Sequence, residues 1–411
     1  MAEYFFDNNA NYPISKDTID CYDKCCKIGN VSCRTKLAMK GKTLIEEFIK
    51  HMEDEFSGNN EQNKYKAIIT SGGSESNSTA IHNYVYNSVF LNGTKPHFIS
   101  STVEHPSVTD YLIRLENDGV ADISWAKPLS NGEIPINNIL SLLKQNTVCV
   151  FLQSVNSETG CVQNITGLWK QLKKIRRDVR IHVDHVQGYR KIDLPVGMAD
   201  TLSISLHKIG APLGIGILIY RSSMKMTPLI AGKQNDGLRG GTYNIGAIAA
   251  ASRVVQTFKM KPMSHYKKYF LQLLSSTYVI RQYEPNMKFN DSPNIVLFSD
   301  EKCLPHTLFM SIVYSNFPNG IGKISDAVVC GKVVKEILFQ DGFTIGTGTA
   351  CANEAKVAEV RGSMTSSDID EYLKMGFIRI SFNNTVSEKI LKQFSQAFNR
   401  IPSIIDEVRR R

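Results

Sequence analysis

The sequence predicts an α/β protein with a mainly parallel sheet in a large domain and a second, smaller α+β domain. Three observations support this prediction. The chain has 411 residues, whereas a single hydrophobic core stops growing at roughly 250–300 residues. Short apolar runs alternate with helical patterns over the first part of the chain. Hydrophobic residues make up 42% and charged residues 21% of the chain, as is usual for a globular protein.

Six short apolar runs, bounded by small or polar residues, predict buried strands. These runs are Ala67–Thr70, His97–Ser100, Val148–Leu152, Ile181–Val183, Leu202–Ile204 and Ile215–Tyr220. Helical patterns lie between or after them, at Ser76–Val89, Asn137–Lys144, Leu168–Arg176 and Ile245–Phe258. The alternation predicts βαβ units and a mainly parallel sheet covered by helices.

The pattern changes after Lys261 and Pro262. Further along, strands are predicted at Asn294–Phe298 and Phe377–Phe382, and helices at Val328–Leu338 and Glu388–Asn399. We therefore expect a large domain over residues 14–261. Residues 1–13 and 262–411 are expected to form the smaller domain.

The formal net charge of +9 does not by itself indicate a nucleic-acid partner. The densest basic runs, Lys170–Arg177 and Arg409–Arg411, are short and typical of a solvated helix face or tail. No window offers the roughly 20 apolar residues of a membrane span, and no cleaved targeting segment is recognised. We expect neither a nucleic-acid nor a membrane partner.

The nine cysteines are odd in number and lack the regular spacing of a disulfide framework. This usage predicts reduced thiols in the cytoplasm or another reducing compartment. Four of the nine cluster at Cys21, Cys25, Cys26 and Cys33. The cluster has neither paired C-x-x-C spacing nor a nearby histidine, so no metal site is expected.

The segment Thr70–Ser76 follows a predicted strand and opens a predicted helix. Its small residues, Gly73 and Ser74 among them, would let backbone N–H groups approach an anion, and the helix dipole would favour binding. The segment predicts a phosphate cradle, although taken alone a simple strand-to-helix turn fits it equally well.

Asp184 and Lys208 each follow a predicted strand, about twenty residues apart. A carboxylate at this place can keep the pyridine nitrogen of a cofactor protonated, and a lysine there can form a Schiff base with an aldehyde cofactor. Taken alone, Asp184 is also typical of a helix cap or turn.

Three further residues could carry chemistry. Cys351 is flanked by small residues in Gly346–Cys351, where a thiol could move and react as a thiolate. His105 precedes Pro106, and Arg379 lies in a predicted strand. Each of them taken singly also fits a structural role.

Together and in chain order, these segments resemble the cysteine desulfurases of the class V aminotransferase group, the branch that serves nitrogenase and iron–sulfur cluster assembly. The resemblance extends from about Phe6 to about Asn399. It implies the fold type I of pyridoxal 5′-phosphate (PLP)-dependent transferases, with PLP as the cofactor.

The resemblance also implies which residues bind PLP. The phosphate contacts would be Gly73, Ser74, Ser205, His207 and, from a neighbouring subunit, Thr242. The contacts to the rest of the cofactor would be His105, Asn156, Asp184, Gln187 and the Schiff-base lysine, Lys208. Because Thr242 would reach the other subunit's phosphate, the resemblance implies a homodimer.

The same resemblance implies the reaction. Arg379 would bind the carboxylate of L-cysteine, with Asn30 of the Gly29–Asn30 pair nearby. Lys208 would take the α-proton, and His105 would stack on the ring and assist proton transfer. Cys351 would attack the substrate sulfur, leaving L-alanine and a persulfide. An acceptor protein, such as an iron–sulfur scaffold, would receive that sulfur.

Some positions depart from the family pattern. The usual Asn-Asn-Glu is Asn156-Ser157-Glu158, and the usual Ala-Thr-Thr-Pro is Ala10-Asn11-Tyr12-Pro13. These departures keep open a scaffold or interaction protein with little activity. Selenocysteine lysis on the same scaffold is a second alternative, and Cys351 argues against a third, transamination.

Overall fold

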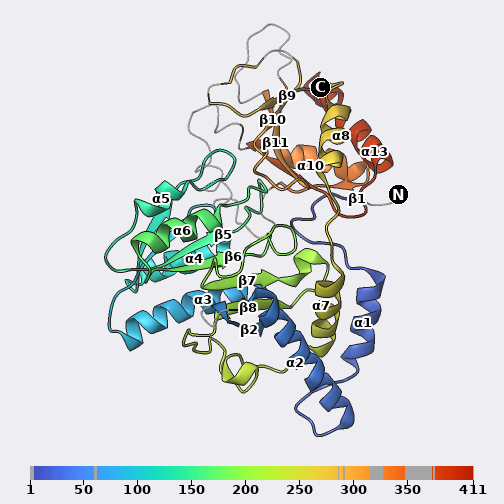
Figure 1. Ribbon diagram of the computed structural model, residues 1–411. Coiled ribbons are helices and arrows are strands. Elements are labelled where there is room, and N and C mark those ends of the chain that lie inside the picture. Colours follow the sequence, from blue (N-terminus) through green and yellow to red (C-terminus); the bar gives the residue numbers. More distant parts are fainter. Residues whose placement is uncertain are drawn as a thin grey trace.

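The computed structural model describes residues 4–59, 63–285, 287–289, 292–314, 327–347, 373 and 375–410. The described chain forms two main sheets with helices around them, and the N-terminal segment passes between the two parts (Figure 1). No helix in these ranges is both long and apolar enough to cross a membrane.

The larger sheet has seven strands in the order β2-β8-β7-β6-β5-β3-β4. Their bounds are β2 Tyr65–Thr70, β3 His97–Ser101, β4 Asp122–Ala126, β5 Thr147–Gln153, β6 Arg180–Asp184, β7 Thr201–Ser205 and β8 Gly216–Arg221. Only β8 runs against its neighbours, β2 and β7, while the other pairs are parallel. The predicted α/β class with a mainly parallel sheet is confirmed.

Apolar side chains cover both faces of this sheet, as parallel sheets require. Successive residues of a strand point to opposite faces, so Ile69 joins one core cluster and Ile68 joins the other. The first cluster contains residues of α2, α6 and α7, and the second contains residues of α3 and α4. The helices are α1 Lys16–Cys26, α2 Lys36–Phe56, α3 Gly73–Tyr86, α4 Pro106–Asn117, α5 Ile136–Leu140, α6 Ile165–Ile175 and α7 Ile245–Thr257.

The second sheet has the order β12-β11-β10-β9, and β14 pairs with β11. Its strands are β9 Val279–Gln282, β10 Asn294–Leu297, β11 Thr307–Val313, β12 Val328–Val329 and β14 Ile378–Ser381. The helices beside it are α8 Ser264–Leu274, α10 Gly331–Gln340, α13 Glu388–Asn399 and α14 Ile401–Arg410. The domain boundary near Lys261 remains a prediction.

Residues close to the N-terminus join this second part. Strand β1 (Tyr4–Phe5) pairs in parallel with β13 (Phe343–Thr344). The Phe6 ring stacks on Phe394 with a centroid distance of 4.4 Å. Phe6 thereby anchors the segment that follows it, which runs on toward the larger sheet.

Two helix predictions were wrong in extent. The helix predicted over Asn137–Lys144 is the shorter α5, which ends at Leu140. The helix predicted from Val328 begins only at Gly331, because Val328 and Val329 pair with the edge of β11 as strand β12. Valine is β-branched and suits a strand. The available edge of β11 therefore decides the local structure in favour of a strand rather than a helix.

The Phe394 ring is central to the second core, and we expect Phe394→Ala to lower the free energy of unfolding by about 3–5 kcal/mol. It packs against Phe6, Phe270 and Phe343 with centroid distances of 4.4, 4.9 and 5.0 Å. Urea denaturation followed by circular dichroism measures the change. The control is Phe90→Ala, whose ring is 71% exposed. Equal losses in the two variants would contradict this packing argument.

Candidate active site

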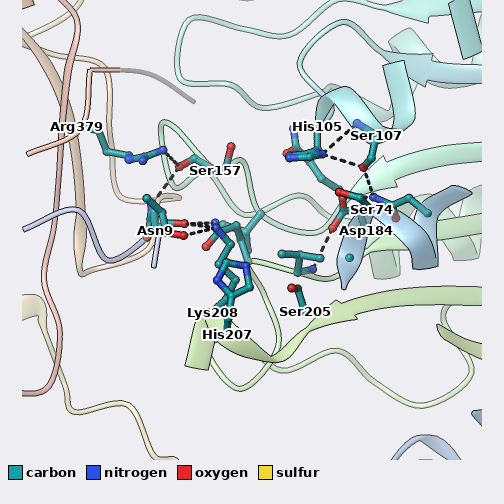
Figure 2. A pocket seen from close by; sticks show the side chains of 17 residues that line it. Asn9, Ser74, His105, Ser107, Ser157, Asp184, Ser205, His207, Lys208 and Arg379 are labelled. Carbon is teal, nitrogen blue, oxygen red and sulfur yellow. Dashed lines mark hydrogen bonds between the residues drawn. The ribbon is translucent and has the colours of Figure 1, made fainter. Parts of the chain in front are cut away.

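A cavity of about 220 Å³ lies beyond the carboxyl ends of β2, β6 and β7, where open parallel sheets bind ligands. The predicted residues that line it are Gly73, Ser74, His105, Asp184, Gln187, Ser205, His207, Lys208 and Arg379. Figure 2 shows Arg379 and Asn9 toward one end of the view, and Asp184 with His105 toward the other. The fold therefore brings most of the predicted site together.

The N-terminus of α3 forms one wall of the cavity. Helix α3 begins at Gly73, and no side chain caps its first turn, so its backbone N–H groups are available to an anion. A Cβ atom added at Gly73 would lie 2.6 Å from Cγ2 of Val186 and 3.3 Å from Cβ of Ser205. Only glycine leaves this cradle open.

Asp184 is held in a fixed orientation at the end of β6. Its Oδ2 accepts a hydrogen bond from Nδ2 of Asn77 at 2.8 Å, and its Oδ1 accepts one from the Val186 N–H at 3.0 Å. The Asn77 amide oxygen lies 3.0 Å from Nε2 of His182. Burial lowers the pKa of His182 to about 3. His182 is therefore neutral, and it orients Asn77 by hydrogen bonding alone.

His105 connects to the same network at the N-terminus of α4. Its Nδ1 accepts the Ser107 backbone N–H at 3.1 Å and lies 2.8 Å from the Ser107 hydroxyl. That hydroxyl accepts a hydrogen bond from Asn77 at 2.9 Å. Because Nδ1 is an acceptor, the neutral ring carries its proton on Nε2.

Lys208 lies in the short 3₁₀ helix Leu206–Ile209 that follows β7. Its Nζ donates to the carbonyl oxygens of Asn9 and Ala10 at 2.7 and 2.8 Å. The neighbouring His207 has a pKa lowered to about 4 by burial and by the charges of Lys208 and Lys191. His207 is therefore a neutral hydrogen-bonding group beside a cation.

Arg379 comes from β14 of the second sheet and is only 2% exposed. Its Nε and Nη2 donate to Oδ1 of Asp7 at 3.0 and 2.6 Å, and its Nη1 donates to the Ser157 carbonyl at 2.9 Å. The ion pair with Asp7 compensates the buried charge. The guanidinium is therefore fixed at the cavity wall before any ligand arrives.

The turn after Asp184 places a second lysine near Lys208. Lys191 Nζ donates to Oε1 of Gln187 at 3.2 Å, and Gln187 Nε2 donates to the Asn9 carbonyl at 2.7 Å. The pKa of Lys191 is lowered to about 7, mainly by burial and then by the charges of Lys208 and Arg379. The Lys191 ammonium can only donate, so it fixes which way the Gln187 amide points.

The turn itself is tied to helix α2. Arg190 has a left-handed backbone with φ of 60°. Its Nη2 and the Tyr189 hydroxyl each reach Oε2 of Glu55 at 2.9 Å. Glu55 thus holds both the bend residue, Arg190, and Tyr189 before it.

Three predicted residues within the described part of the chain are not among those that line the cavity. Asn30 is exposed, and its Oδ1 accepts the Ser32 N–H. Asn156 is buried, and its Oδ1 accepts the N–H groups of Glu158 and Thr159, both at 2.9 Å. Thr242 is exposed. Cys351 lies outside the described residues, and the roles predicted for all four stay predictions.

Residues that the sequence analysis did not select line the cavity or hold the side chains that line it. Asp7 pairs with Arg379, and the Asn9 carbonyl accepts a hydrogen bond from Lys208. Asn77 donates to Asp184, and Lys191 donates to Gln187. The polar run Asp7–Asn9 directly after apolar Tyr4–Phe6 is a signal that could have identified the first two. In the described ranges no group of three or more His, Cys, Asp or Glu side chains could hold a metal ion.

The fold and the cavity are those of an enzyme that binds a phosphorylated cofactor beside a partly buried lysine, Lys208. The model of the family "Aminotransferase class-V" matches residues 4–394, so the chain belongs to the class V aminotransferases, which are PLP-dependent enzymes.

Relatives and solved structures agree with this family. A "NifS/IcsS protein homolog" of Lactobacillus delbrueckii subsp. bulgaricus is 28% identical over 97% of this chain and 96% of its own. A "Putative cysteine desulfurase NifS" of Bacillus subtilis is 28% identical over 96% and 93%. The solved structure of a "NIFS-LIKE PROTEIN" superposes with a TM-score of 0.78 at 21% identity, covering 98% of this chain and 100% of that one.

The residues present fit PLP. The open cradle at Gly73 suits a phosphate, the fixed Asp184 carboxylate suits a protonated ring nitrogen, and the Lys208 amine suits an aldehyde carbon. Each feature belongs to a different wall of the same cavity, so one small molecule could engage all three.

We expect Gly73→Ala to weaken PLP binding at least about tenfold, or about 1.4 kcal/mol, because its Cβ would collide with Val186. Fluorescence titration of the apoprotein measures the affinity. The double variant with Val186→Ala removes the colliding atom and should recover part of the loss. Unchanged affinity in the single variant would contradict the cradle.

Lys191→Met should stabilise the apoprotein more at acid than at alkaline pH. The pKa of Lys191 is about 7 in the folded protein and about 10.4 in the unfolded chain. Below pH 7 the lysine is charged in both states, and the full cost of the buried charge then destabilises the folded protein. This destabilisation fades as the pH rises from about 7 to about 10. Melting temperatures at about pH 6 and about pH 10 measure the difference.

The matched control is Lys42→Met on helix α2, where the lysine side chain is 69% exposed. Its effect on the melting temperature should be small and the same at both pH values. A gain for Lys191→Met that does not change with pH would contradict the shifted pKa.

Proposed function

We propose that this chain is a cysteine desulfurase, which converts L-cysteine to L-alanine and passes the sulfur on as a persulfide. The observation that carries the proposal is that the Lys208 amine, the Asp184 carboxylate and the Arg379 guanidinium face one cavity. The names of the two relatives and the family membership support the same activity.

Bound PLP supplies an electron sink for the negative charge that develops at the substrate α-carbon. Gly73, Ser74, Ser205 and His207 would hold its phosphate, and Asp184 would keep its ring nitrogen protonated. His105 would stack on the ring and Gln187 would donate to its phenolic oxygen. The hydrogen bond from Asn77 keeps the Asp184 carboxylate directed at one place.

Arg379 is proposed to bind the substrate carboxylate. A guanidinium has five donors in a planar fork that matches a carboxylate, and the contacts with Asp7 and Ser157 leave it buried but at the cavity wall. Asp7 fixes the fork, so little conformational entropy is lost when substrate binds. Asn30 stays a proposed substrate contact, and Asn156 a proposed cofactor contact.

Lys208 is proposed to remove the α-proton once its amine is free. The carbonyl oxygens of Asn9 and Ala10 hold Nζ by hydrogen bonds to its protons. The charge of Lys208 in turn contributes, after burial, to the lowered pKa of the neighbouring Lys191. His105, with Nδ1 as an acceptor and a proton on Nε2, is placed to exchange a proton in the same cavity.

Cys351 is proposed as the nucleophile. Its thiolate would attack the substrate sulfur, the carbon–sulfur bond would break, and Cys351 would carry the persulfide. We further propose that a thiol of an acceptor protein, such as an iron–sulfur scaffold, takes this sulfur in a reducing compartment. The chain would act as a homodimer, with the exposed Thr242 reaching the phosphate in the other subunit's cavity.

The test is the release of alanine from L-cysteine in the presence of a reductant. Lys208→Ala should lower the rate at least about 10²–10⁴-fold, the usual contribution of a general base. Cys351→Ser should keep the absorbance of bound PLP and lose the persulfide. Lys42→Ala on α2 is the control and should match wild type.

Two outcomes of the same assay would favour the alternatives. A PLP-loaded, folded protein that releases no alanine with or without an acceptor thiol protein would favour the scaffold alternative. Release of alanine from L-selenocysteine but not from L-cysteine would favour selenocysteine lysis. Sulfur loading of a Cys351→Ser protein would overturn the assignment of Cys351.

A further inference from the structure

Two buried cysteines from distant parts of the chain face each other outside the candidate active site. Cys161 ends the turn that begins at Asn156, and Cys303 lies between strands β10 and β11. The two residues form an isolated antiparallel bridge. Neither lines the cavity beyond the carboxyl ends of the larger sheet.

The hydrogen bonds around this bridge define its type. The Val162 N–H donates to the Lys302 carbonyl at 3.0 Å, and the Leu304 N–H donates to the Gly160 carbonyl at 2.8 Å. The bonds therefore join the residues that flank the two cysteines rather than the cysteines themselves. Such a non-hydrogen-bonded antiparallel pair has Cα atoms about 4.5 Å apart and side chains close together on one side.

The two thiols are close enough for Cys303 to perturb Cys161. Cys161 is fully buried and Cys303 is 6% exposed. A hydrogen bond with the Cys303 thiol, followed by burial, raises the pKa of the Cys161 thiol. Disulfides need Cα atoms about 4.4–6.8 Å apart, and the spacing typical of a non-hydrogen-bonded antiparallel pair lies at the short end of that range.

A second pair of neighbouring thiols lacks this geometry. Cys21 and Cys25 are four residues apart on α1, and the pKa of the Cys21 thiol is raised by burial and then by the neighbouring Cys25. The Cβ atoms of such a helical pair are about 5–6 Å apart, whereas a disulfide needs about 3.5–4.5 Å. Proximity alone therefore does not single out Cys161 and Cys303; the cross-strand register does.

We propose that Cys161 and Cys303 form a reversible disulfide under oxidation. With oxidised glutathione, the Cys303 thiolate attacks one glutathione sulfur, the glutathione S–S bond breaks, and one reduced glutathione leaves. The Cys161 thiolate then attacks the Cys303 sulfur of this mixed disulfide, and the second reduced glutathione leaves. Two protein thiols are oxidised, and one disulfide is reduced to two thiols. An excess of a thiol reductant reverses the bond.

The bond would join the turn over residues 156–161 to the segment before β11. The two are already joined, since the Ser299 hydroxyl donates to the Thr159 carbonyl at 2.8 Å. The same turn offers the Ser157 carbonyl to Arg379. Oxidation would therefore cross-link the two parts of the molecule next to the Arg379 contact.

The experiment uses the full-length apoprotein without L-cysteine, so its result does not depend on the proposed activity. The protein is refolded from urea in a buffer of reduced and oxidised glutathione, which gives buried thiols access to the exchange. Remaining thiols are alkylated, and peptides are mapped by mass spectrometry. We expect a Cys161–Cys303 linked peptide and a melting temperature several degrees above that of the reduced protein.

Variants separate the bond from other oxidation. Cys303→Ser leaves the more deeply buried Cys161 in place and should abolish the thermal shift, whereas Cys25→Ser should retain it. A folded, oxidant-treated protein in which Cys161 and Cys303 are both recovered alkylated would overturn the proposal. So would a full thermal shift in Cys303→Ser.

Discussion

The ion pair between Arg379 and Asp7 is the interaction on which the arrangement of the site depends. Both partners are buried, and separating them would leave an uncompensated charge, which costs several kcal/mol. Their pairing joins β14 of the second sheet to the segment after Phe6. That segment in turn supplies the Asn9 carbonyl, which accepts hydrogen bonds from both Lys208 and Gln187. One ion pair therefore places residues from three distant stretches of sequence around one cavity.

Much of the large sheet could be predicted from sequence because its strands are buried on both faces. Runs such as Ala67–Thr70 and Ile215–Tyr220 are continuous apolar stretches, and they coincide closely with β2 and β8. Their relative direction could not be predicted, since nothing local to Ile215–Tyr220 distinguishes an antiparallel strand from a parallel one. The same limit applies to Val328–Val329, whose strand exists only because β11 offers an edge.

The site was predictable where chemistry follows a strand directly. Asp184 and Lys208 each come after an apolar run, and the carboxyl ends of parallel strands share one edge of a sheet. Asn77 could not be selected in this way, because it lies on helix α3 and its role arises from contacts with Asp184 and His182 on strand β6. Lys191 is one of many lysines in the sequence, and only burial next to other cations distinguishes it.

The left-handed backbone at Arg190 has a mechanical consequence for the site. A non-glycine residue in this conformation costs on the order of 1–2 kcal/mol. The strained backbone would therefore relax unless other contacts held it in place. Helix α2 holds it through Glu55. The C-terminal end of α2 therefore holds the turn that carries Gln187 in its strained conformation. Loss of the Glu55 contacts would let this turn relax, and the effect would reach Gln187 in the cavity wall from outside the cavity.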